Sequence, residues 1–305
     1  MITTSPAEFL KAFAALETRP DVATTARAAF LIAPADFSLA EESARDNRYM
    51  DMDRSVDPLK ALAQHAELAQ ALRADCPVIV FPGDPSTPDA IFPNNVFATA
   101  PGRLIVGRMR HPVRQREAQR EDIRAFFGDL LGYTETDLST RDDLVAELTG
   151  SLIIDHRRGV GFCGLSERCD MAGARAIFEA FGLRLMFCFE LTASEYHTNV
   201  VLAILAGRAA IIAADGFRDP SVPLAIATAY AERVIHLSPA QKQAFAGNAI
   251  TLGEHRVWMS AVAAASLTGG QRALLALEGF EIGSVVLDEI EKAGGSLRCC
   301  VAEIF

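Results

Sequence analysis

The sequence lacks several features that mark particular classes of protein. Its 305 residues carry a net charge of −10, which argues against a nucleic-acid surface because a phosphate backbone requires clustered Lys and Arg. No basic segment followed by an apolar run begins the chain, so no signal peptide is expected. The longest apolar stretch, around Val200–Asp215, is interrupted by Gly207 and Arg208 and is too short to span a bilayer. We therefore expect a cytoplasmic protein without nucleic-acid or membrane partners.

The six cysteines lack the spacing of a metal site. No CxxC pair is followed by a second one, so a zinc site is not expected. Cys76, Cys163 and Cys188 stand in apolar surroundings, as buried small hydrophobic residues do. The adjacent pair Cys299 and Cys300 differs, because it follows two glycines and an arginine and precedes a short apolar segment that ends the chain.

Short apolar runs alternate with amphipathic helical patterns along the whole chain. The patterns predict helices over residues 10–16, 57–74, 114–131, 170–181, 220–233 and 239–246. They predict strands over 29–32, 77–81, 91–99, 103–106, 151–155, 160–165, 184–190, 200–205, 209–213 and 234–237, with further short elements at 249–252, 256–259 and 284–292. No linker or block of charge marks a boundary, so one domain over 1–305, built of several similar modules, is expected. Periodicity alone leaves α/β and α+β open.

Polar residues beside apolar runs are the first candidates for a site. Asn94 and Asn95 stand within Asp89–Phe97, where buried amides are costly unless they are paired. From the pattern alone, a Pro-Asn-Asn turn is the favoured explanation of these two residues. Glu147 precedes small residues at the start of a predicted strand. A carboxylate there can orient a base, and it is just as often part of a solvated loop.

A histidine and a thiol complete the candidates. His197 begins an apolar run, where a lone histidine is more often a hydrogen-bonded structural residue than a catalyst. Cys299 fits a buried inert thiol, but the adjacent Arg298 is expected to lower its pKa. Together, a thiolate, a proton shuttle, an orienting carboxylate and neutral amides form a set that nucleophilic catalysis requires.

Four motifs in this order resemble those of the guanidino-modifying amidinotransferase (pentein) superfamily, which includes arginine deiminase and dimethylarginine dimethylaminohydrolase. The motifs are Phe92–Asn95, Thr149–Ser151, Tyr196–Val200 and Gly294–Phe305. The resemblance is closest to the citrulline-hydrolase-like branch, and Glu41–Asn47 resembles the mobile loop of that branch. It implies an α/β fold, a five-bladed propeller of ββαβ modules, with the active site in the central channel.

The resemblance also implies roles for the candidate residues. Cys299 would be the nucleophile, with Cys300 as its packed neighbour. His197 would be the general acid and base, and Glu147 the carboxylate that orients it or holds a substrate nitrogen. No metal or organic cofactor is implied.

Substrate binding would fall to a second group of residues. Asp89 would contact the α-amino group of an amino-acid substrate. Arg108 and Arg168 would clamp its α-carboxylate through their bidentate guanidinium forks, although surface arginines are the alternative.

Three asparagines depart from the pattern of the deiminases and dimethylargininases. Asn94 and Asn95 stand where those enzymes place acidic side chains, and an aspartate is frequent near Asn199. An uncharged amide can face both the C=O and the NH₂ of a ureido group, so we favour a ureido substrate such as citrulline. Related arginine dihydrolases also carry asparagine here and accept arginine.

The sequence therefore predicts a cysteine-dependent hydrolase of the ureido or guanidino C–N bond, with citrulline converted to ornithine, CO₂ and ammonia. The alternatives are a dimethylarginine dimethylaminohydrolase, an arginine deiminase, an arginine dihydrolase, or an amino-acid-binding relative without activity. A small-molecule substrate is the only partner that the pattern requires, and a homo-oligomer is compatible with it.

Overall fold

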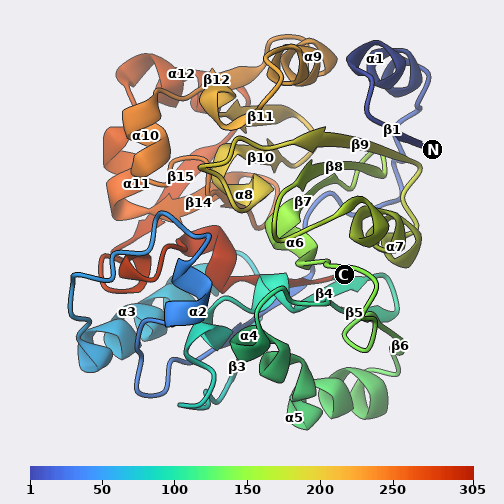
Figure 1. The fold of residues 1–305 in the computed structure, drawn as a ribbon. Coiled ribbons are helices and arrows are strands. Elements are labelled where there is room, and N and C mark those ends of the chain that lie inside the picture. The colour runs from blue at the N-terminus through green and yellow to red at the C-terminus, as the bar shows by residue number, and fades with distance from the viewer.

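The computed structural model describes all residues from Met1 to Phe305 and contains five separate sheets. The long helices lie outside the sheets, at the periphery of the molecule (Figure 1). The strands of each sheet, given in the order in which they pair, are as follows: β16 (Ala302–Ile304)–β2 (Ala28–Ile32)–β3 (Val78–Phe81); β4 (Phe97–Ala100)–β5 (Arg103–Val106)–β6 (Thr134–Asp137); β7 (Leu152–Asp155)–β8 (Val160–Leu165)–β9 (Leu185–Glu190)–β1 (Ile2–Thr3); β10 (Leu202–Leu205)–β11 (Ala209–Ile212)–β12 (Val234–His236); and β13 (Ile250–Thr251)–β14 (Arg256–Ser260)–β15 (Glu281–Val285).

The same three-strand unit occurs in all five sheets. Its first strand is antiparallel to the second, and the second is parallel to the third. At least one helix connects the second strand to the third, as a parallel connection requires. The order ββαβ predicted for the modules is therefore present, and the fold belongs to the α/β class.

The first sheet contains the C-terminal strand of the chain. Its first strand, β16, comes from the C-terminus and pairs with β2, with Ala302 opposite Phe30. Thr99 of β4 links this sheet to the next one, because its hydroxyl donates to the carbonyl of Glu303 and accepts from the N–H of Phe305. The last residues of the chain are thus held by β2 on one side and by Thr99 on the other, which fixes the turn before β16 in place.

The connecting helices begin and end at recognisable signals. Asp57 caps α3 (Pro58–Leu72), and proline occupies the first helical position. Asp170 caps α7 (Met171–Phe181), which ends at Gly182 in the left-handed conformation. The remaining helices are α1 (Pro6–Ala14), α2 (Glu41–Ala44), α4 (Pro112–Gln115), α5 (Glu121–Ala125), α9 (Ser221–Ala229), α10 (Pro239–Gln243), α11 (Ala261–Ser266) and α12 (Gly269–Leu277).

Short helical turns precede the first strands and lie toward the centre of the molecule, where α6 (Leu148–Ser151) and α8 (Thr198–Val201) are visible in Figure 1. Two 3₁₀ turns, η2 (Pro93–Asn95) and η7 (Leu297–Cys300), hold the corresponding positions before β4 and β16. The polar motifs of the sequence are all on these turns or directly before them.

Several predicted elements differ from the structure. Residues 91–99 are not one strand: 3₁₀ turns precede β4, which begins only at Phe97, because Pro93 and two asparagines interrupt the apolar run. The helix predicted over 114–131 is divided at Arg120, whose extended backbone separates η3 (Arg116–Gln119) from α5. Helices α11 (Ala261–Ser266) and α12 (Gly269–Leu277) were not predicted from the sequence. No helix is long and apolar enough to cross a membrane.

Candidate active site

A chain of hydrogen bonds connects the turns before the five first strands. The Thr149 hydroxyl donates to the carbonyl of Asn94 at 3.0 Å, and Asn199 Nδ2 donates to the carbonyl of Thr149 at 3.4 Å. Asn248 Nδ2 in turn donates to the carbonyl of Asn199 at 3.0 Å, and Asn248 Oδ1 accepts the N–H of Cys299 at 3.4 Å. Each module therefore contributes one residue to a chain of bonds that ends at Cys299.

Cys299 lies on η7 and is 1% exposed. Its Sγ accepts N–H groups from Asn199 Nδ2 at 3.4 Å and from Asn248 Nδ2 at 3.3 Å. Gly294 precedes it with φ +74°, and a side chain at Gly294 would collide with Asn47, so this tight approach requires glycine.

The two adjacent thiols face different surroundings. Cys299 lines a small cavity together with the predicted residues Asp89, Asn95 and Arg168. Cys300 is fully buried, and its Sγ donates to the carbonyl of Ser296. Of the two thiols, only Cys299 lines the cavity.

His197 and Glu147 form a fully buried pair, and Asn199, two residues after His197, contacts Cys299. His197 Nε2 lies 2.9 Å from Glu147 Oε2, and both side chains are inaccessible to solvent. Burial would raise the pKa of Glu147, but the charge of Arg168 and the hydrogen bond from His197 hold it well below its usual range. Burial lowers the pKa of His197 despite the adjacent carboxylate. The pair is therefore a carboxylate and a neutral imidazole.

The hydrogen-bond network assigns the tautomer of His197. Because Glu147 is an acceptor, Nε2 carries the proton and Nδ1 has a free lone pair. Nδ1 is buried without a partner. A side chain on Gly150 would collide with both Nδ1 of His197 and Oδ1 of Asn95, so these two atoms flank the backbone of Gly150. The imidazole is ready to accept a proton.

Buried polar atoms without a partner gather in the same region. They include one carboxylate oxygen of Asp89, both polar atoms of the Asn94 amide and Oδ1 of Asn95. The other Asp89 oxygen accepts a bond from the Ser43 hydroxyl. Such atoms are rare in folded proteins because an unpaired buried polar group is unfavourable. Three of these four atoms are acceptors, so the site suits a ligand that is rich in N–H donors.

Arg168 is buried between two carboxylates. Its Nη1 lies 3.2 Å from Glu147 Oε2, and its Nη2 lies 2.5 Å from Asp46 Oδ1. Asp46 also lies 3.1 Å from Nε2 of His111. Burial would raise the pKa of Asp46, but the hydrogen bonds from His111 and Arg168 lower it. The arginine predicted to bind a carboxylate thus holds one from the protein itself.

Asp46 belongs to the segment that resembles a mobile loop, and this segment is seated on the cavity. Ser43 contacts Asp89, and Asn47 Nδ2 donates to the carbonyl of Gly294 at 3.3 Å. The Tyr49 hydroxyl donates to Glu195 Oε2 at 2.7 Å. Ser43 and Asn47 also line the cavity.

Two predicted features are placed elsewhere. Arg108 does not line the cavity; it bonds to the carbonyl of Ser139 at 3.0 Å and to Asp142 at 2.6 Å. Arg298 is turned away from the thiol and bonds to Glu303 at 2.9 Å. Burial raises the pKa of Cys299 and outweighs hydrogen bonds from Asn248 and the Ser296 backbone and the charge of Arg298. The lowered thiol pKa expected from Arg298 is therefore wrong.

Sequence reasoning missed two residues of the site, Arg114 and Asn248. Arg114 lines the cavity, is paired with Glu117 at 2.9 Å and donates to the carbonyl of Phe92 at 3.1 Å. Its i,i+3 acidic neighbour was visible in the sequence, but nothing there showed that the pair is buried. The position of Asn248 before a short apolar run, like that of Asn95, was the available signal for it.

Several known proteins are similar to this chain in sequence or in fold. Residues 33–305 match the family described as N,N dimethylarginine dimethylhydrolase, eukaryotic. The chain is 25% identical over 252 residues to the uncharacterized protein YkgA of Bacillus subtilis, with 81% of each chain covered. It is 29% identical over 269 residues to N(G),N(G)-dimethylarginine dimethylaminohydrolase of Mycobacterium tuberculosis, covering 85% of this chain and 80% of the relative.

Among solved structures, the N-terminal domain of ArgZ, a cyanobacterial arginine dihydrolase, has the same fold. It superposes with a TM-score of 0.78 at 19% identity, and the match covers 93% of this chain and 98% of that domain. That domain has been seen bound to substrate and covalently bonded to a reaction intermediate. The chain described here belongs to the N,N-dimethylarginine dimethylhydrolase family, in the arginine-modifying pentein superfamily, and is a hydrolase of C–N bonds other than peptide bonds.

Proposed function

We propose that this enzyme hydrolyses the guanidino group of an arginine-derived amino acid through a covalent intermediate on Cys299. The observation that supports this most is the combination in one region of the Cys299 thiol, the His197–Glu147 pair and the unpaired acceptor atoms. A buried nucleophile, a base oriented by a carboxylate and buried acceptor atoms that have no donor partner meet the needs of attack on a guanidinium carbon.

The first half of the reaction forms the intermediate. Nδ1 of His197 takes the thiol proton, and Cys299 Sγ attacks the central carbon to form a tetrahedral adduct. The imidazolium, stabilised by Glu147, then returns the proton to the departing nitrogen, and ammonia or an amine leaves. An S-alkylthiouronium on Cys299 remains.

The second half of the reaction consumes one water. His197 removes a proton from the water as the oxygen attacks the thiouronium carbon, and the C–S bond breaks. The products are a ureido compound and the restored thiol. A buried Cys299 with a raised pKa is favoured as a thiolate once a cationic guanidinium is beside it, so the substrate itself assists the first step.

The α-ammonium and α-carboxylate groups of an amino-acid substrate would each have a partner in the cavity. The free oxygen of Asp89 suits the α-ammonium group, and Arg168 suits the α-carboxylate. Because Asp46 now holds Arg168, the substrate carboxylate would replace it, and the segment around Asp46 would shift. Arginine and N,N-dimethylarginine both carry these groups, and relatives named for each of them share the family or the fold.

Citrulline is the second candidate substrate. The observation in its favour is that Asn94, Asn95 and Asn199 are neutral amides, which can face a ureido group as both donors and acceptors. Repeating the same cycle on citrulline would release ornithine, ammonia and CO₂. An enzyme that performs both cycles on arginine would be a dihydrolase.

The proposal extends to the architecture. We infer that the five ββαβ units are blades of one catalytic domain with Cys299 near their common axis. Support comes from the five sheets of matching strand order and from the hydrogen-bonded chain of turns that joins them.

Product analysis tests the proposal and separates the substrates. The purified protein is incubated with arginine, N,N-dimethylarginine or citrulline, and ammonia, dimethylamine, citrulline and ornithine are measured, with Cys299→Ser as the blank. Dimethylamine with citrulline indicates a dimethylargininase, ammonia with citrulline a deiminase, and ornithine a citrulline-hydrolysing step. Release of none of these from all three compounds would contradict the proposed function.

A further inference from the structure

We propose that Asn248 is a positioning residue that holds Cys299 in place and stabilises its thiolate. This proposal rests on the nucleophilic role of Cys299 in the proposed function. Asn248 does not line the cavity, so it acts through the cysteine and not on the substrate.

Three hydrogen bonds fix the Asn248 amide. Oδ1 accepts the N–H of Cys299 at 3.4 Å, while Nδ2 donates to the Asn199 carbonyl at 3.0 Å and to Cys299 Sγ at 3.3 Å. The backbone N–H only donates and the carbonyl only accepts, so the amide cannot be reversed without losing both bonds. Asn248 therefore presents an N–H donor to the sulfur in a fixed orientation.

The second amide on the sulfur has more freedom. Asn199 Nδ2 lies 3.4 Å from Sγ, and Asn199 Oδ1 lies 3.8 Å from it, within reach of the S–H proton. Asn199 can therefore contact either the thiol or the thiolate. Asn248 has already used its oxygen on the Cys299 backbone, so it offers only the donor that a thiolate prefers.

None of the charged or titratable groups near Cys299 is an unpaired cation that could stabilise the thiolate. They are Arg298 on the same turn, Asp89, Arg114, Arg168 and Tyr196 around the cavity, and the Glu147–His197 pair on the neighbouring turns. All three arginines are paired with carboxylates: Arg298 with Glu303, Arg114 with Glu117, and Arg168 with Asp46 and Glu147. Neutral N–H donors on Sγ thus become important for a thiolate in this buried site.

The fold explains why Asn248 reaches the sulfur. It stands directly before Ala249 and β13, the position in the fifth module that corresponds to Asn95 in the second. A side chain on the preceding residue, Gly247, would collide with the carbonyl of Val200, so glycine allows this turn to pack against the turn of His197. The fifth module, which supplies no other proposed site residue, takes part in the chemistry through Asn248.

The test measures the pH dependence of alkylation at Cys299. In a Cys300→Ser background, trypsin cleavage after Arg298 releases a C-terminal peptide, 299–305, whose only thiol is Cys299. Iodoacetamide labelling of this peptide is followed by mass spectrometry across the pH range, which gives an apparent thiol pKa that is independent of turnover. Thermal melting confirms that each variant is folded.

Asn248→Asp is the sharper variant. It keeps an acceptor for the Cys299 N–H but loses the donor to Sγ and adds a negative charge, so the alkylation midpoint should rise by about 1 pH unit or more. Asn248→Ala removes both contacts and should raise the midpoint by about 1 unit as well. Both variants should show kcat/KM at neutral pH reduced about tenfold or more, while kcat recovers as the pH rises. Asn47→Ala, which perturbs the cavity without touching the sulfur, should leave the midpoint unchanged.

The outcomes separate this proposal from the proposed function. A wild-type midpoint in folded Asn248→Asp overturns the role of Asn248, and so does an equal shift in Asn47→Ala. If Asn248→Ala does not fold, Asn248→Asp alone decides. A shifted midpoint supports the proposal even if Cys299→Ser retains turnover, a result that would instead remove the proposed function.

Discussion

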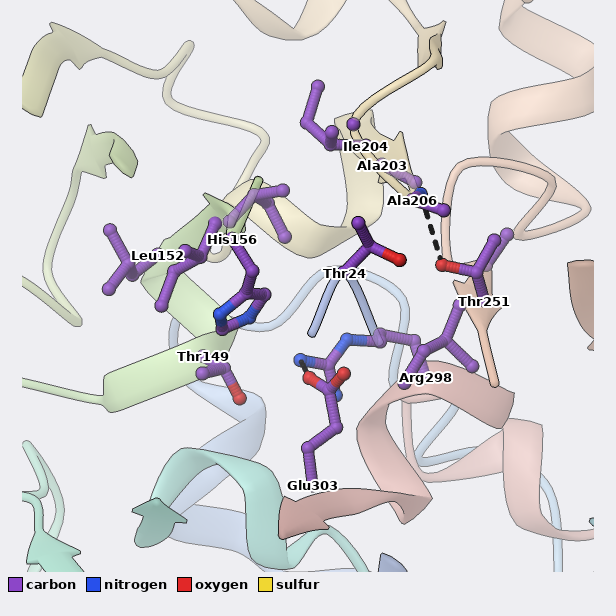
Figure 2. A pocket seen from close by; sticks show the side chains of 15 residues that line it. Thr24, Thr149, Leu152, His156, Ala203, Ile204, Ala206, Thr251, Arg298 and Glu303 are labelled. Atoms are coloured by element: carbon purple, nitrogen blue, oxygen red, sulfur yellow. Dashed lines mark hydrogen bonds and ion pairs between the residues drawn. The ribbon is translucent and has the colours of Figure 1, made fainter. Parts of the chain in front are cut away.

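Two polar pockets lie on either side of the turn that carries Cys299, and they contain similar residues. The cavity beside Cys299 has Arg168 with Glu147 and His197 behind it. The other pocket, in Figure 2, is lined by His156 and by Arg298 paired with Glu303 at 2.9 Å. Each side thus has a largely buried arginine, glutamate and histidine.

The difference between the pockets lies in what remains unpaired. Beside Cys299, Asp89, Asn95 and His197 each have a buried polar atom without a partner. In the other pocket the Arg298–Glu303 pair is satisfied, the His156 ring stacks on Phe305 with centroids 4.0 Å apart, and no thiol is present. An arginine, a glutamate and a histidine are therefore not sufficient for a reactive site. The cavity beside Cys299 differs from the other pocket because it also has a nucleophile and buried polar atoms without hydrogen-bond partners.

The largest effect is expected from the two glutamates. Glu147→Gln removes the carboxylate that orients His197 and should lower kcat about 10³-fold. Glu303→Gln is the matched control, because it also removes the partner of a buried arginine but should keep kcat within a few-fold. Steady-state kinetics with the best substrate compare them. Equal losses of kcat would mean that both pockets support the reaction.

The same two variants should differ in stability. Glu303→Gln leaves the buried Arg298 without a carboxylate, which costs on the order of 3 kcal/mol when no other partner compensates. Arg168 retains Asp46, so Glu147→Gln should be the milder of the two in urea unfolding. A greater loss of stability in Glu147→Gln would show that Asp46 does not hold Arg168 in solution.

The arginines should give the next largest effect. Arg168→Gln removes the proposed partner of the substrate carboxylate and should raise KM about 10²-fold, since a charge-assisted bidentate contact is worth about 3 kcal/mol. Arg298→Gln should change KM by less than about threefold, because its guanidinium faces the other pocket. If KM rose in Arg298→Gln and not in Arg168→Gln, the substrate carboxylate would bind in the pocket of Arg298 and not in the cavity beside Cys299.

Much of the fold was predictable, because strands and helices alternate in the local pattern of apolar residues. The parts that were missed depend on tertiary contacts. Residues 91–99 look like a strand because Phe92, Val96 and Phe97 are apolar, yet their turn is held by partners such as Thr149 and Arg114. Helix α11 is mostly alanine and gave little periodic signal, whereas α12 begins with two glycines, although its capping box of Thr268 and Gln271 was visible in the sequence.

The site could be predicted only in part for a similar reason. Cys299, His197 and Glu147 stand in motifs whose order is visible along the chain. The structure pairs His197 with Glu147 and places Asn199, from the same motif as His197, against Cys299. The direction of a side chain is not visible in a sequence. Arg108 therefore seemed equal to Arg168, and Arg298 was expected to face the thiol, although Arg108 points toward Asp142 and Arg298 toward Glu303.

The smallest effect concerns pH and His156. Burial, with the charges of Arg298 and Arg19, lowers the pKa of His156 to about 3, so the folded protein keeps this ring neutral. Because the folded pKa lies below the unfolded value of about 6.5, stability is lost as the pH falls from about 6.5 toward 3. His156→Phe should flatten this loss by up to about 1.4 kcal/mol per pH unit and leave kcat/KM at neutral pH unchanged.

Urea unfolding at several pH values checks this prediction. His65, whose pKa burial lowers to about 4, will leave some acid sensitivity in the variant. An acid profile that is identical to that of the unchanged protein would show that His156 is already solvated in the folded state.

The most direct measurement of the central claim is the site of the covalent intermediate. The protein is mixed with N,N-dimethylarginine or arginine, quenched in acid within the first turnovers, and the C-terminal peptide 299–305 is analysed by mass spectrometry. A thiouronium adduct on Cys299 that carries the amino-acid part of the substrate, retained in Cys300→Ser and absent together with turnover in Cys299→Ser, is the predicted result. An adduct on Cys300, or product formation by Cys299→Ser, would contradict it.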